Sequence, residues 1–132
     1  MDERLIEGGK HEDARGKLRF CNDFDMTAVK RFYTIANSKD APVRGWIGHK
    51  RERKWFFPLK GKTVIEIEPM DMNYEAHEIH KRPFELDAER PEVLLVKPWN
   101  WFCIKQDGEA EVMVFSDCRV GEYKDDDFRR SI

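Results

Sequence analysis

The sequence has few cysteines, no excess of charge of one sign and no long apolar run. Its three cysteines, Cys21, Cys103 and Cys118, lack C-x-x-C spacing, which excludes a disulfide scaffold and a zinc knuckle. The 24 basic and 26 acidic residues give a net charge of −2, so nothing in the balance attracts nucleic acid or an anionic membrane. Apolar runs stop at four residues, as in 93–96, whereas a membrane helix needs about 20. We therefore expect no nucleic acid partner and no membrane partner.

The opening, MDERLIEGGKHEDAR, also lacks the apolar segment of a signal peptide, and we expect a cytoplasmic protein with reduced, mostly buried thiols. The 132 residues have the length of one compact domain, which we place at 1–132. Hydrophobic residues make up 40% of the chain and charged residues 38%, so a core can form under a strongly charged surface.

Short runs rich in β-branched and aromatic residues dominate the chain and predict an all-β fold. Strands are expected at 17–20, 29–35, 54–59, 63–67, 93–97, 101–105 and 111–115. Within 63–68, Ile65 and Ile67 alternate with Val64 and Glu66, as a half-buried strand requires. Seven strands separated by turns indicate a sandwich or a barrel. We expect 71–92 to be an irregular excursion with at most one strand, and 122–132 to be a helical turn or a frayed tail.

The most unusual local sequence is RGWIGHK at 44–50, where two glycines flank an aromatic residue and His49 follows. Glycine permits a tight bend or the close approach of a ligand. An imidazole can act as a general base near neutral pH when a carboxylate or a phenol orients it. The other interpretation is that His49 is a surface or hydrogen-bonded structural histidine.

Three further features have both a functional and a structural interpretation. The cluster 50–54, KRERK, has a net charge of +3 and either binds a pyrophosphate or forms a solvated hairpin end. The four tryptophans, Trp46 and Trp101 among them, either stack on a base or sugar or pack in the core. His77 and His80, beside Glu75 and Glu78, are more consistent with a solvated loop than with a metal site. No nucleophile elbow or phosphate-binding glycine loop is present.

Five segments, in order, resemble the small cupins that act on nucleotide-linked sugars, namely the sugar-nucleotide 3,4-ketoisomerases and relatives with a WxcM-like domain. They are DARG at 13–16, VKRFY at 29–33, RGWIGHK at 44–50, PWNWF at 98–102, and EVMVFS at 111–116 followed by YKDDDF at 123–128. They are similar to the family's D-x-R-G, I-K-R-V-Y, R-G-x-H-A-H-K, P-x-x-W-H and final-strand patterns. The resemblance covers most of the chain.

This resemblance implies a cupin-type jelly-roll β-barrel that forms a homodimer. It further implies a metal-free site, without a cofactor, for a thymidine-diphosphate-linked (dTDP-linked) 4-keto sugar, used in making cell-surface polysaccharide sugars. His49 matches the second family histidine and would be the catalytic base, and Tyr33 would donate to it or orient it. Substrate-binding candidates are Arg15, Arg31, Arg44, Trp46, Lys54 and Trp101.

The chain departs from the family pattern at three positions. Ile47 replaces the first histidine, Lys54 the later glutamine, and Phe102 the histidine after the tryptophan. An isoleucine accepts no proton, so an epimerase mechanism that uses that first histidine is not expected. The two function hypotheses are an isomerase or epimerase that uses His49 with Tyr33, and a non-catalytic cupin that binds a nucleotide sugar or another carbohydrate.

Overall fold

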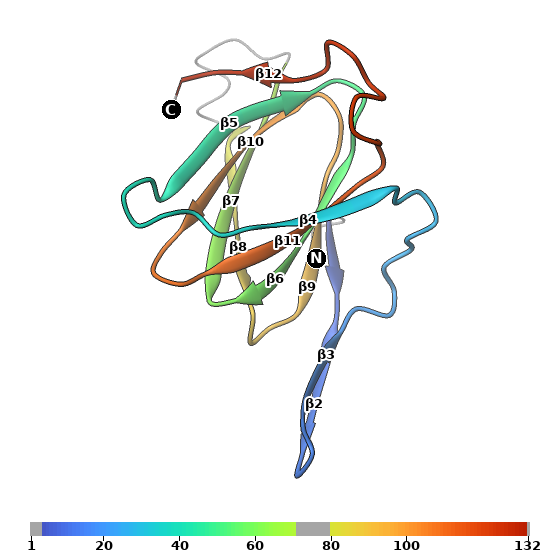
Figure 1. Cartoon of the computed structure of the whole chain (residues 1–132), viewed down its shortest axis with the longest axis vertical. Helices are drawn as coiled ribbons and strands as arrows, with labels where there is room; N and C mark the ends of the chain where they lie inside the picture. Colours follow the sequence, from blue (N-terminus) through green and yellow to red (C-terminus); the bar gives the residue numbers. More distant parts are fainter. Residues whose placement is uncertain (1–3, 71–79, 132) are drawn as a thin grey trace.

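The protein folds into two five-stranded antiparallel sheets with a hairpin that extends away from them (Figure 1). The structure, a computed structural model, describes residues 4–70 and 80–131. The first sheet has the order β1 (Leu5–Glu7), β9 (Glu92–Val96), β6 (Lys54–Lys60), β11 (Glu111–Ser116) and β4 (Arg31–Ile35). The second has the order β12 (Phe128–Arg129), β5 (Val43–His49), β10 (Asn100–Gln106), β7 (Lys62–Pro69) and β8 (Arg82–Asp87). β2 (Gly9–Asp13) and β3 (Gly16–Phe20) form the hairpin.

This arrangement confirms the predicted all-β jelly roll, and the seven predicted strands are present with slightly different ends. The strands that were not predicted from the sequence are β1, β2, β5 and β12. The expected helical turn or frayed tail is wrong for 128–129, because these residues form β12 and pair with β5. In the segment expected to be irregular, β8 pairs with β7 over six positions, and 71–79 lie outside the described residues.

The hydrophobic core lies between the two sheets, and alternation along the strands selects its members. On β7, Ile65 and Ile67 are buried in this core, whereas Val64 and Glu66 are only half-buried on the other face, as predicted. Phe56 on β6 meets Phe102 on β10 with ring centroids 5.6 Å apart. The core therefore fills the space between the sheets and leaves one end of the barrel for polar side chains.

A β-bulge in β5 changes which residues of this strand face the inside of the barrel. Ile47 lies opposite Phe102, but Gly45 lies opposite Cys103, so that Trp46 is one extra residue in β5. Because of this extra residue, Arg44 lies opposite the core residue Ile104 and faces inward. Gly45 has φ +133°, and a Cβ there would lie 2.9 Å from backbone atoms of β10, so glycine alone fits this position.

The three cysteines are free, as expected, and two of them, Cys103 and Cys118, are buried. Burial raises the pKa of the Cys103 thiol, which makes it a poor nucleophile. Across 4–70 and 80–131 the structure has no helix that is both long enough and apolar enough to cross a membrane.

Candidate functional site

A cavity of about 410 Å³ lies where β5 ends and β6 begins, under the segment that connects β11 to β12. Its size is within the range of small-molecule sites, and its lining is rich in charged side chains. The side chains come from β4, from β5, from the turn 50–53, from the first residue of β6 and from 118–129. The site therefore joins segments that are far apart in the sequence.

Five of the predicted site residues line this cavity: Arg31, Tyr33, Arg44, His49 and Lys54. Alternation places Arg31 and Tyr33 on the inner face of β4, while Phe32 between them is 66% exposed on the outer face. The bulge in β5 brings Arg44 to the same face as His49. Lys54 shares the inner face of β6 with Phe56, so its buried side chain is directed between the sheets.

Trp46 and Trp101 lie outside this cavity, and the structure gives them a different environment. Their rings pack on the Arg130 guanidinium, with Cζ 4.7 Å from the Trp46 centroid and 5.0 Å from the Trp101 centroid. Arg130 also donates to Glu68, which is only 2% exposed, over 2.7 Å. The bulge explains why Trp46 is not among the inward residues. Both tryptophans thus pack on the outer face of the sheet, where their contacts with Arg130 help to hold β12 against β5.

Arg15 lies at the turn of the β2–β3 hairpin, away from the cavity, and its side chain is 88% exposed. Its guanidinium donates to Asp13 at 2.8 Å, and this contact holds the pKa of the Asp13 carboxyl below its usual range. It lines a separate hollow on the hairpin together with Leu18. Within one chain, Arg15 is not part of the cavity, and its role in substrate binding stays a prediction.

The histidine of the cavity is buried and has a defined tautomer. His49 is 7% exposed, and its Nδ1 lies 2.6 Å from the backbone carbonyl oxygen of Asp126. Because a carbonyl oxygen only accepts hydrogen bonds, Nδ1 carries the proton and donates it. The lone pair is then on Nε2, which is buried and has no hydrogen-bond partner among the described residues. An imidazole with this arrangement is prepared to act as a base at Nε2.

Asp126 holds the turn that follows His49. Its carboxylate accepts the backbone N–H groups of residues 50–52 at 2.7–3.2 Å. Burial acts to raise the pKa of Asp126, but these three donors outweigh it and hold the pKa below the usual range of an aspartate. The expectation of a helical turn or a frayed tail at 122–132 did not include this role. The run of three aspartates at 125–127 gives no local signal that separates Asp126 from its neighbours.

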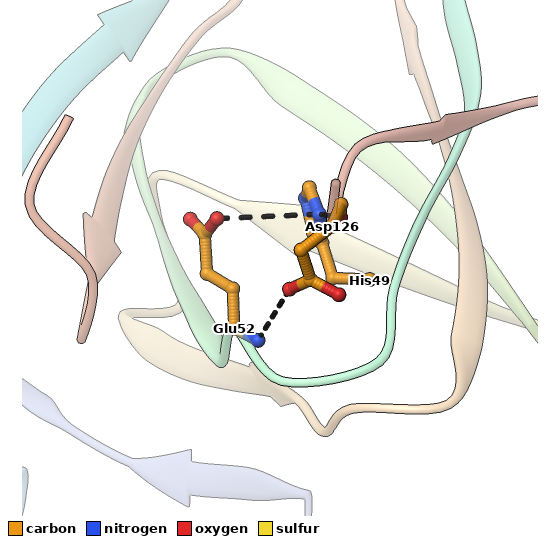
Figure 2. A group of neighbouring side chains, drawn as sticks. All are labelled: His49, Glu52 and Asp126. Atoms are coloured by element: carbon orange, nitrogen blue, oxygen red, sulfur yellow. Dashed lines mark hydrogen bonds and ion pairs between the residues drawn. The ribbon is translucent and has the colours of Figure 1, made fainter. Parts of the chain in front are cut away.

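Glu52 is a second site residue that sequence reasoning missed. It is 7% exposed, and its Oε2 accepts the Ser116 hydroxyl at 2.6 Å, with Lys54 Nζ at 3.8 Å. Its other oxygen, Oε1, lies 4.0 Å from His49 Nδ1. Figure 2 shows the carboxylate directed toward the imidazole, and the Glu52 backbone N–H bonded to Asp126. In the sequence, Glu52 is the one acidic residue within the basic run 50–54, and this was the only local sign of its role.

His49, Glu52 and Asp126 offer ligand atoms within 4.8 Å of one another, so we tested whether they suit a metal. Both Asp126 oxygens are occupied by backbone donors, and His49 Nδ1 donates to a carbonyl oxygen. The Glu52 carboxylate has a lysine at its Oε2. This donor set fits a proton-handling site and does not fit a cation. Of the residues weighed earlier as metal ligands, Glu75, His77 and Glu78 lie outside the described residues, while His80 is exposed.

A family model described as "FdtA: WxcM-like, C-terminal" matches the chain over residues 1–132. The chain belongs to this family. A search among curated proteins gave no match. The match to the family model confirms the family resemblance inferred from the sequence. It covers the whole chain, including the segments that carried the resemblance, at 13–16, 29–33, 44–50 and 98–102.

Solved structures with the same fold include two 3,4-ketoisomerases. This WxcM-like chain is 20% identical to a variant of QdtA from Thermoanaerobacterium thermosaccharolyticum in complex with TDP-4-keto-6-deoxyglucose, with TM-score 0.71 over 98% of this chain and 90% of that one. It is 17% identical to a 3,4-ketoisomerase from Helicobacter canadensis, with TM-score 0.73 over 98% and 92%. ChmJ, a 3'-monoepimerase from Streptomyces bikiniensis, is 13% identical, with TM-score 0.75 over 95% and 67%. These similarities show the cupin-type fold.

All three departures from the family pattern shape the cavity of this WxcM-like chain, and Lys54 lines it as described above. Ile47 lines the cavity beside His49 and offers no polar atom. Phe102 packs against the imidazole, with ring centroids 5.9 Å apart. The described part of the cavity thus contains one imidazole, and its other ionisable groups are carboxylates, cationic side chains, tyrosines and the Cys118 thiol.

Proposed function

We propose that this protein is a nucleotide-sugar isomerase that acts on a dTDP-linked 4-keto hexose. The observation that supports it most is His49, which lines a cavity of a size that suits a ligand and whose buried Nε2 has no hydrogen-bond partner among the described residues. Membership of the WxcM-like family and the ketoisomerases among the structural neighbours agree with this reaction class. A cavity that only bound a sugar would not need an imidazole held in one tautomer.

The charges of the cavity are divided in a way that suits a substrate with a diphosphate at one end. Arg44, Arg119 and Arg129 line the cavity but are themselves exposed, so they lie toward its opening. Guanidinium groups bind phosphate oxygens with paired hydrogen bonds and remain charged at all relevant pH values. The reacting sugar would then reach the buried end, next to His49.

His49 would begin the reaction by taking a proton from the carbon next to the keto group. That C–H is acidified because the electron pair can move onto the carbonyl oxygen and form an enolate. An imidazole suits this step, since the base must both take the proton and release it again at the end. Tyr33, on the same cavity wall as Arg31, would donate to a sugar oxygen and orient the ring. We further propose that the reaction takes place in the cytoplasm, because free thiols are typical of a reducing compartment.

Binding and proton exchange together test this function. We expect titration calorimetry to show that thymidine diphosphate binds more tightly than uridine diphosphate. We then expect NMR in D₂O to show exchange at the carbon next to the keto group of TDP-4-keto-6-deoxyglucose, followed by conversion to the 3-keto sugar. Binding without exchange would support the non-catalytic cupin instead. Absence of binding to either nucleotide would contradict the proposed isomerase and would leave only a cupin that binds another carbohydrate.

We also propose that the chain is a homodimer, because the β2–β3 hairpin needs a partner surface. Two strands alone are marginally stable in water, and here they extend from the barrel with Leu18 59% exposed (Figure 1). At the barrel end of the hairpin, Arg19 donates to the carbonyl groups of Pro58 and Leu59. Residues 10–18, toward the hairpin turn, are exposed. We expect sedimentation equilibrium to give the mass of a dimer, and Leu18→Glu to give a monomer. A monomeric wild-type chain at micromolar concentration would refute the proposal.

A further inference from the structure

The proposed reaction moves two protons, and a single imidazole serves only one of them. Conversion of a 4-keto sugar into a 3-keto sugar transfers one hydrogen between carbons and another between oxygens. Ile47, which also lines the cavity, cannot transfer a proton. A second acid/base group is therefore required near His49, and the cavity must supply it.

Glu52 has the position and the contacts for this task. Its two oxygens are in different environments, because Oε2 accepts the Ser116 hydroxyl at 2.6 Å and an Arg31 N–H at 3.5 Å. Oε1 makes no hydrogen bond with the described residues and lies 4.0 Å from His49 Nδ1 (Figure 2). One oxygen thus fixes the carboxylate, and the other has free lone pairs beside the imidazole.

Cationic side chains surround the buried Glu52 carboxylate. Lys54 Nζ lies 3.8 Å from Oε2, and Arg31 approaches the same oxygen. An isolated buried carboxylate would be strongly disfavoured, and nearby cations offset that cost. The backbone N–H of Glu52 is bonded to Asp126, so the main chain that carries this side chain is held as well.

We propose that Glu52 is a second catalytic residue, which transfers a proton between the two adjacent oxygens of the sugar while His49 transfers the proton between the carbons. This inference rests on the proposed function. The inference also specifies the substrate, which must have a hydroxyl group next to the keto group. Without that hydroxyl, Glu52 Oε1 would have no proton to accept from the sugar. Substrates without that hydroxyl would exchange a proton and would not isomerise.

The steps balance without a cofactor. His49 Nε2 takes the proton from the carbon that bears the hydroxyl, the C–H electron pair forms a carbon–carbon double bond, and the carbonyl pair moves onto the keto oxygen. Glu52 Oε1 takes the hydroxyl proton and delivers it to that oxygen. The other oxygen then forms the new carbonyl, and the double-bond pair takes the proton back from His49 at the former keto carbon. Both residues return to their starting states.

Glu52→Gln tests the assignment because the amide keeps the shape and the Ser116 contact but cannot transfer a proton. With TDP-4-keto-6-deoxyglucose in D₂O, we expect net isomerisation to fall about 100-fold or more, a typical value for loss of an acid/base group. Exchange at the carbon should fall much less, since His49 still forms the enolate. Affinity for thymidine diphosphate should stay within about twofold of the wild-type value, because this nucleotide lacks the keto hexose on which Glu52 would act. Glu52→Asp should recover part of the isomerisation.

Glu68→Gln is the matched control, because Glu68 is an equally buried and cation-paired carboxylate outside the cavity. It should leave the ratio of isomerisation to exchange unchanged. If Glu52→Gln lowers both rates by the same factor, or lowers neither, the inference is wrong while the proposed function stands. If the wild-type protein binds the nucleotide and exchanges no proton, the proposed function fails, and this inference fails with it.

Discussion

Replacement of His49 by asparagine is expected to lower the rates of proton exchange and isomerisation by about 1,000-fold, within the range for loss of a general base. The reason is that Nε2 is the basic nitrogen that would accept the proton, and asparagine has no basic nitrogen. Folding should be unaffected, because the asparagine amide can replace Nδ1 as the donor to the Asp126 carbonyl oxygen. Steady-state NMR kinetics on TDP-4-keto-6-deoxyglucose, with calorimetry of thymidine diphosphate binding, measure both effects.

His80→Asn is a suitable control, because His80 is exposed and lies outside the cavity. It should leave exchange, isomerisation and nucleotide affinity at wild-type values. Wild-type turnover in His49→Asn would remove His49 from the mechanism. A loss of nucleotide affinity as large as the loss of rate would instead mean that His49 contributes to binding.

Asp126→Ala is expected to have the largest effect on stability, a loss of about 3 kcal/mol in the free energy of unfolding. The alanine leaves three backbone N–H groups at 50–52 without their acceptor, and the turn between β5 and β6 loses its anchor. Activity should fall too, because this turn carries Glu52 and follows His49. Urea denaturation measures the change in stability. Asp127→Ala is the control, because its exposed ion pair with Arg129 is worth under about 1 kcal/mol.

The contribution of Asp126 should also depend on pH. The folded state holds the pKa of Asp126 below its usual range, so its stabilisation is fully present above the pKa of the unfolded chain, about 3.9. It is lost as the pH falls through the lower pKa of the folded state. The stability difference between the wild type and Asp126→Asn should therefore be constant near neutrality and shrink below about pH 4. A difference that stays constant into that acidic range would contradict this account.

The strands and the inward residues of β4 were predictable because alternation is a local property. In β7, Ile65 and Ile67 differ from Val64 and Glu66 within the strand itself, and the structure buries them as expected. The same logic places Tyr33 on the cavity wall. The resemblance supplied the position of His49, and composition alone left its role open.

The remaining site residues could not be predicted, because their roles arise from contacts between distant segments. Asp126 meets the turn 50–52 across about 75 residues, and Ser116 meets Glu52 across 64. In the sequence, Asp126 is one of three aspartates in a row, and Glu52 lies in a basic run that resembles a solvated turn. The environment of Trp46 was likewise hidden, since the extra residue in β5 is visible only through its register with β10.

The extra residue in β5 also constrains how this chain can change during evolution. Insertions and deletions are usually tolerated in loops, where they shift no side chain from one face to the other. If the bulge were absent and Trp46 paired with Cys103, Arg44 would turn away from the cavity and Gly45 would take the inward position. Relatives without the bulge would need their inward arginine one place later. The bulge and the spacing between Arg44 and His49 are therefore coupled, because a strand that is one residue shorter here keeps its arginine inward only if it also lacks the bulge.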